Sequence, residues 1–344
     1  MFKTLNPAED TITSRITVTN GFHDGGVGTL AGSNYTTASL SATQKSYYYN
    51  IQYNSKDHFS VSYGHIEGSG SQEQSITVEG TTQAIYKQFY NFTEPSAENL
   101  RDQTGFIINS VTSSDAYFIV AERLQMKDRL NPGTWTINLS GSTTAGVGKF
   151  LKLTDDSKTT DPITPGSPFG EVYSILSGST GTTVGTTKYG KFYPDAGLFV
   201  LSANEVSSSL PGTGSFVQAA GGSVIQGNGL GQDTRVNSAA DNAWKMTRAL
   251  QQGSVTLRSE EKQYIYDYFC RAKASEFNLS SNVTFWSGSD YQMRHNDMVT
   301  NPQTYISEVG LYDNLNNLIA IGRLSSAINK NFSSEAIVKV RLTY

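Results

Sequence analysis

The chain has 344 residues, of which 37% are hydrophobic and only 16% are charged, and glycine alone numbers 32. This length allows one large β domain or two to three smaller ones. The net charge of −4 and a pI near 5.6 provide no basic field for nucleic acid or an anionic membrane. Cys270 is the single cysteine, which excludes an internal disulfide framework and a cysteine-rich metal site, and we expect a buried, inert thiol there.

No run of the sequence approaches eighteen apolar residues, and the first ten residues lack the apolar segment of a signal peptide. We therefore expect a soluble protein that is made in a cytoplasm and is not exported by a Sec-type signal.

The first two hundred residues predict a series of strands and one helix. Alternating or aromatic β-type runs predict strands over 11–20, 46–53, 58–64, 104–111, 116–122, 134–139, 149–154 and 171–176. A turn is expected over 111–115. Residues 81–91 predict a helix, because its aromatic side chains recur four residues apart. Residues 188–204 predict a hairpin that turns at Pro194–Gly197.

Residues 203–238 are dominated by Ser, Gly, Asn and Gln and predict a long loop or linker. Residues 238–252 then predict the clearest helix, with Ser238 as its N-cap and Gly253 as its stop. The predicted domains are a β-rich domain over 1–202, the linker over 203–238, and a helix plus β-sheet module over 239–344.

The chain from Lys262 to Tyr344 has the cleanest β periodicity. Tyr264, Tyr266 and Tyr268 alternate along one predicted strand, 304–311 and 318–324 predict a hairpin, and 335–344 predicts a strand with one apolar face. We expect this stretch to form a sheet core, with interfaces on the loops around it, including 280–300. The expected fold is mainly β, with several antiparallel sheets arranged like a sandwich, one or two short helices and long polar loops.

The search for chemistry yields no enzyme signal, and we predict no catalytic, cofactor or metal site. His23, His58, His65 and His295 match no zinc spacing. The Gly-rich pieces 25–28 and 227–231 lack the Lys-Ser/Thr of a phosphate loop, and the Asp residues of 155–161 lack calcium-loop spacing. The polar cluster 294–297 could be an acid–base site or could fix the conformation of its own loop. We prefer the second interpretation.

Tyrosine is abundant, with 19 copies beside 16 Phe, often in polar surroundings. Sheet packing, a protein–protein interface and carbohydrate stacking all use such residues. The predicted interface residues are Tyr264, Tyr266, Tyr268, Trp286, Tyr291 and Tyr312.

The C-terminal string FNLSSNVTFWSGSDYQMRH…NPQTYISEVGLYDNLNNLIAIGRLSSAINKNFSSEAIVKVRLTY resembles virion structural proteins of large contractile-tailed phages, particularly marine cyanophages. The pieces MKDRLNPGTWTINLSG, FYPDAGLFVLSA and RSEEKQYIYDYFCRAKASEFN are similar to the same family. The resemblance spans roughly residues 11–20, 81–140 and 190–344.

The resemblance implies a structural part of the virion and no catalysis. A baseplate wedge subunit is the first expectation, and a neck or head–tail connector protein is the second. The implied partners are other tail and baseplate proteins and copies of this chain, and we expect neither nucleic acid nor a membrane as a partner. The implied location is the virion, after synthesis in the host cytoplasm. A receptor- or carbohydrate-binding tail module, with a host-surface glycan as partner, and a cell-wall hydrolase are the rival functions.

Overall fold

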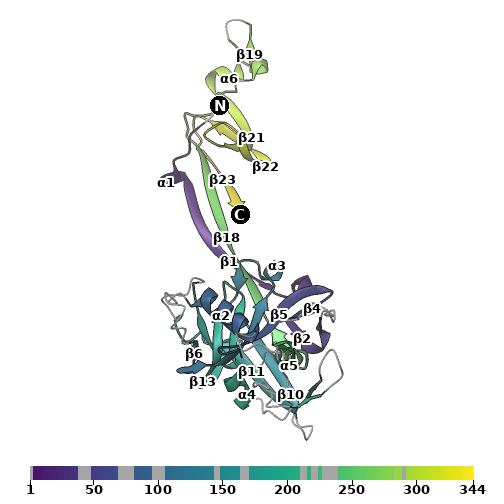
Figure 1. The fold of residues 1–344 in the computed structure, drawn as a ribbon. Coiled ribbons are helices and arrows are strands. Elements are labelled where there is room, and N and C mark those ends of the chain that lie inside the picture. Colours follow the sequence, from purple (N-terminus) through teal and green to yellow (C-terminus); the bar gives the residue numbers. More distant parts are fainter. Residues whose placement is uncertain are drawn as a thin grey trace. The chain divides into compact units, whose positions relative to one another are not determined.

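The structure is a computed structural model. It describes residues 3–37, 48–68, 81–94, 105–142, 148–162, 170–209, 215–217, 224–226, 239–280, 282–288 and 292–344. The chain forms two compact units, drawn with their elements in Figure 1. The central unit is Val18–Glu261, and the terminal unit combines Met1–Thr17 with Lys262–Tyr344. This division differs from the predicted boundaries at 202 and 239.

The central unit is built on one antiparallel sheet of eleven strands. In spatial order these are β2 (Thr29–Ala31), β17 (Ser254–Thr256), β10 (Thr136–Ser142), β11 (Gly148–Asp155), β12 (Tyr173–Ser179), β13 (Thr182–Tyr193), β14 (Leu198–Ser202), β8 (Asp115–Ala121), β5 (Lys56–His65), β4 (Tyr48–Tyr53) and β3 (Thr36–Thr37). The mainly β, antiparallel fold predicted from the sequence is confirmed.

The sheet curls around helix α5 (Ala239–Gln251). Its two end strands, β2 and β3, are joined by only four residues, which span at most roughly 18 Å. The helix contacts β4 and β5 near one end of the sheet and β10 and β17 near the other. Trp244 of the helix meets Tyr49 with ring centroids 5.1 Å apart. The predicted helix over 238–252 is therefore present, but it is a core element of the central unit and not part of a C-terminal module.

The opposite face of the sheet is covered by α2 (Thr81–Thr93), as predicted for 81–91. Alternate residues of β8 point to the two faces, so that Tyr117 lies in the core around α5 and Phe118 lies under α2. The ring of Phe89 stacks on Phe118 with centroids 4.2 Å apart. The central unit thus buries both faces of its sheet, which explains its continuous apolar strands.

Two predictions about the central unit are wrong. Residues 104–111 do not form a single strand, because positive φ at Asn109 and Ser110 turns the chain from β6 (Phe106–Ile108) into β7 (Val111–Ser113), where a turn was predicted. The start of the predicted linker 203–238 is helical, as α4 (Ala203–Ser209). Within that linker, β15 (Ser215–Val217) pairs with β16 (Val224–Gln226), and the rest lies outside the described residues.

The terminal unit contains long strands and short helices. The strands β1 (Thr11–Gly21), β18 (Arg258–Ala272) and β23 (Ala336–Thr343) form one sheet, in which β9 (Arg129–Leu130) also pairs with β18, and β21 (Gln303–Tyr312) pairs with β22 (Leu318–Asn331) as a hairpin. The terminal unit also contains α1 (Pro7–Asp10), β19 (Trp286–Ser287), β20 (Gln292–Met293) and α6 (Asp297–Thr300), whereas the short helix α3 (Arg123–Met126) belongs to the central unit. Strands β1 and β18 both continue across the division between the units.

Candidate protein interface

The terminal unit has few buried apolar side chains. Both clusters of buried hydrophobic residues in the described chain belong to the central unit. The prediction that residues 262–344 form a sheet core is therefore wrong in one respect. The predicted strands are present, but the hydrophobic core of the described chain lies in the central unit. Many large apolar residues of this unit are exposed instead: Ile12, Ile16, Tyr264, Val283, Val299, Tyr305, Tyr312, Leu315, Leu318, Ile319, Ile321, Phe332, Ile337 and Tyr344. Exposed apolar residues that lie together in one patch are typical of a binding surface.

The β21–β22 hairpin has two apolar faces, and β23 covers one of them. On the inner face Leu311 is buried, and a Cβ atom at Gly322 would lie 3.4 Å from Val340 of β23. On the other face Gly310 pairs with Ile321, and a Cβ atom at Gly310 would contact the side chains of Tyr312 and Leu318. Because side chains alternate along a strand, one face packs on β23 while the opposite face is exposed in the part of the chain that the structure describes.

We call the open side the outer hairpin face. It comprises Glu308, Tyr312, Leu318, Ile321 and Arg323, and the exposed Ile319 stands beside it. A bulge between the Leu311–Ala320 and Tyr312–Leu318 pairs leaves Ile319 without a partner residue across the hairpin, so two consecutive large apolar residues stand at its tip. The sequence signal for this face is the run LIAI at 318–321, which is apolar at both alternating positions and was not singled out as an interface.

The structure distributes the predicted interface residues over three places. Tyr264 is exposed, whereas Tyr266 and Tyr268 are half-buried, with stacked rings 6.4 Å apart. Trp286 is half-buried, and its indole N–H donates to the Ser280 carbonyl at 3.0 Å. Tyr312 lies on the outer hairpin face. Tyr291 lies outside the described residues. Their role as an interface stays a prediction.

The other face of the β18–β23 pair carries a cluster of charges. The Asp267 carboxylate accepts two hydrogen bonds from the Arg341 guanidinium, at 2.8 and 3.0 Å, and lies 2.8 Å from Lys339 Nζ. These hydrogen bonds hold the pKa of Asp267 well below its ordinary value of 3.8. The cluster ties the last strand of the chain to β18.

We expect Asp267→Asn to weaken the terminal unit at neutral pH but not in acid. A carboxylate with a lowered folded pKa stabilises above its unfolded value of 3.8, and that contribution is lost as pH falls below 3.8 toward the folded pKa. The midpoint of urea unfolding, followed by circular dichroism, should therefore differ between the two proteins at pH 7, and the difference should shrink below pH 3.8. A constant difference across this range would contradict the prediction.

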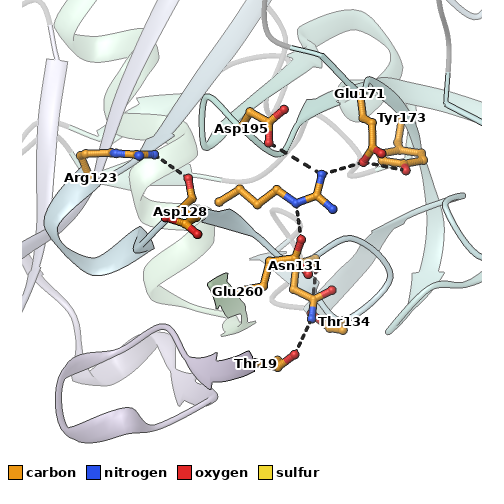
Figure 2. A network of polar contacts seen from close by, with 10 residues as sticks. Thr19, Arg123, Asp128, Asn131, Thr134, Glu171, Tyr173, Asp195 and Glu260 are labelled. Atoms are coloured by element: carbon orange, nitrogen blue, oxygen red, sulfur yellow. Dashed lines mark hydrogen bonds and ion pairs between the residues drawn. The ribbon is translucent and has the colours of Figure 1, made fainter. Parts of the chain in front are cut away.

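A second polar cluster, in the central unit, is centred on Arg129, and Figure 2 labels its carboxylate partners Glu171, Asp195 and Glu260. Arg129 Nε donates to the buried Glu260, and Nη1 lies 2.7 Å from Glu171 and 3.7 Å from Asp195. The Tyr173 hydroxyl adds a hydrogen bond to Glu171 at 3.2 Å. Burial lowers the pKa of Arg129, but its carboxylate partners outweigh burial and raise it above its ordinary value. The guanidinium therefore stays charged and joins the sheet to the first residues of β18.

The residues beside Arg129 also hold the other strand that leaves the central unit. Asn131 donates its side-chain N–H to the Thr19 hydroxyl of β1 at 2.9 Å (Figure 2). Its backbone N–H donates to the carbonyl of Arg258 at 2.9 Å. Thr19 and Glu260 each lie two residues from a point where the chain passes between units. Residues 129–131 therefore anchor both crossing segments within the central unit, an arrangement that the sequence did not indicate.

Two of the histidines form a buried pair that spacing along the chain did not predict. His23 and His58 lie edge to face with ring centroids 5.5 Å apart, and the rings of Phe22 and Tyr35 surround them. Burial lowers the pKa of His23 to about 4, an effect to which His58 adds, and burial also lowers the pKa of His58. Both side chains are thus held neutral at pH 7.

We expect the central unit to lose about 3 kcal/mol of stability through His23 as pH falls from 6.5 to about 4. The unfolded chain binds a proton near pH 6.5, whereas the folded pKa is lower, so acid favours unfolding. His58→Leu should flatten this part of the stability–pH curve, because it removes one titrating ring and its repulsion on His23. His295→Leu, at an exposed site of the terminal unit, is the control, and an equal flattening in both variants would contradict the assignment.

The other polar motifs have local structural roles. Gly25 and Gly26 adopt positive φ, as turn glycines do. The buried Asp155 accepts the backbone N–H groups of Gly133 at 2.9 Å and Ser157 at 3.1 Å. Arg294 donates to the Trp286 carbonyl at 2.8 Å, which fits the loop-fixing interpretation of 294–297. The motif 227–231 lies outside the described residues.

Cys270 is half-buried, and burial raises the pKa of its thiol. This is the environment of an unreactive cysteine.

Among the described residues, no three His, Cys, Asp or Glu side chains gather as metal ligands would. In the same part of the chain, no helix has the length and apolar character needed to cross a membrane. No protein-family model, curated protein or solved structure matches this chain.

Proposed function

We propose that this protein is a structural component of a contractile-tailed phage virion and acts as a baseplate subunit through protein–protein interfaces. The observation that supports an interface role is the composition of the terminal unit, which carries exposed apolar strands and little core of its own. The assignment to a phage tail rests on the resemblance of its C-terminal sequence to virion proteins.

The apolar strand faces of the terminal unit provide a physical reason for an interface role. A sheet needs one face covered, and strands with two apolar faces are typical of sheets covered on both sides. Among the described residues, the outer hairpin face and Ile337 of β23 are exposed. A partner that buried them would remove apolar area from water at about 25 cal/mol per Å².

The low charge density fits the same role. Only 16% of the residues are charged, so an interface can form without desolvating many ions.

The test is to locate the chain in purified virions of a phage that encodes it. Gold-labelled antibodies against the chain should mark the distal end of the tail in electron micrographs. Label at the portal vertex alone would overturn the baseplate assignment and favour the neck alternative. Absence of the chain from particles, checked by mass spectrometry, would overturn the structural role altogether.

A further inference from the structure

We infer that the outer hairpin face binds the same face of a second copy of this chain. The inference deepens the proposed function by naming a partner and a surface, and it rests on the interface role but not on the phage assignment. The face is exposed: Ile321 is 54% exposed beside the exposed Tyr312 and Leu318, and the adjacent bulge residue Ile319 is 60% exposed. The inner face of the same hairpin already packs on β23.

The charges within this face indicate what covers it. Glu308 and Arg323 lie opposite each other across the hairpin, and Glu308 Oε1 is 3.0 Å from Arg323 Nε. Both side chains are largely exposed, at 49% and 78%. A partner surface of one sign would meet a like charge at one of these two residues, which is unfavourable.

A second copy avoids that conflict. In a two-fold interface, every contact between two different residues occurs twice, once in each direction. Glu308 of one copy can therefore face Arg323 of the other, while Arg323 of the first copy faces Glu308 of the second. The apolar residues of the two faces then pack together between the charged pairs. The terminal unit carries ten Lys and Arg against nine Asp and Glu, so net repulsion between copies is small.

The test exchanges charges between copies and uses the full-length chain. Sedimentation equilibrium should show wild-type protein associating beyond its monomer mass of 37.4 kDa. Glu308→Arg and Arg323→Glu should each weaken association at least tenfold, because each makes like charges face one another. An equimolar mixture of the two variants should restore it, since every contact between unlike copies is then of opposite sign.

An apolar variant tests the same surface without altering charge. Ile321→Ser should also weaken association at least tenfold, and mixing it with either charge variant should not restore the wild-type value. Lys56→Glu is the matched control, because Lys56 forms an exposed ion pair with Asp24 in the central unit. Circular dichroism of every variant establishes that the fold is kept, which is expected since exposed pairs contribute little to stability.

Three results would overturn the inference. They are a wild-type chain that stays monomeric up to about 100 µM, association that neither charge reversal weakens, and a mixture that associates no better than its components. Each is distinct from failure of the phage assignment, which the antibody label on virions measures. A monomeric chain that marks the tail tip would keep the proposed function and remove the second copy as its partner.

Discussion

Trp135→Ala is expected to lower the free energy of unfolding of the central unit by about 4 kcal/mol. Trp135 is fully buried, and its ring meets those of Phe192 and Phe199 with centroids 5.2 and 4.9 Å away. It stands directly before β10, whereas its two partners come from β13 and β14, so it packs across the inside of the curled sheet. Its removal would leave a cavity that the surrounding strands cannot close without breaking their register. Urea denaturation followed by far-ultraviolet circular dichroism measures the loss.

Two controls separate this packing effect from a general sensitivity of the sheet. Trp135→Phe keeps most of the ring and should cost about 1–2 kcal/mol. Phe150→Ala removes an aromatic side chain from β11 that is 66% exposed, and it should change stability by less than about 0.5 kcal/mol. Equal losses for the alanine and phenylalanine variants of Trp135 would contradict the cavity argument.

Arg129→Met is expected to cost about 2–3 kcal/mol. The substitution removes the counter-charge of Glu260, whose side chain is 6% exposed, and leaves Glu171 and Asp195 nearby with the same sign. Removal of one partner from a fully buried pair costs about 3–5 kcal/mol, and the 16% exposure of the Arg129 side chain places this case below that range. Denaturation of the purified variant at pH 7 provides the measurement.

A second substitution, at Glu260, distinguishes the effect of the lost charge from the effect of lost packing. Glu260→Leu combined with Arg129→Met should recover part of the loss, because no buried carboxylate then remains without its partner. Lys56→Met removes an exposed ion pair with Asp24 and should cost less than about 1 kcal/mol. If the double variant loses more stability than the losses of the two single variants added together, an unpaired buried charge does not explain the effect of Arg129→Met.

Local sequence was sufficient for elements whose signals lie within a few residues. The hairpin over 188–204 is predicted by Pro194–Gly197, and Gly197 adopts the positive φ that its turn requires. The helix over 81–91 is predicted by its four-residue aromatic spacing, and the structure places Tyr86 and Tyr90 in the core beneath it. The turn at Asn109 and Ser110 was missed because neither residue is a glycine, although both adopt positive φ.

The functional surfaces were less accessible to sequence reasoning. Tyr312 was among the predicted interface residues, but its neighbours Ile319 and Ile321 were included in the stretch expected to form a sheet core. Apolar alternation cannot distinguish a strand that faces a core from one that faces a partner, because both bury the same side chains. The histidine pair and the Arg129 cluster join residues from separate strands, and such contacts have no signal in spacing along the chain.

The sequence by itself determined the fold class, mainly β, because β-type alternation and turn residues are local signals that can be recognised without knowledge of the fold. It also determined where most strands lie, including the terminal strand with its buried Ala336 and Val338. Only the tertiary structure decided that α5 belongs inside a curled sheet and that the first residues join the last in one unit. It alone separated the open hairpin face from the covered one, because burial depends on which strands meet, and strand pairing brings together residues far apart in the chain.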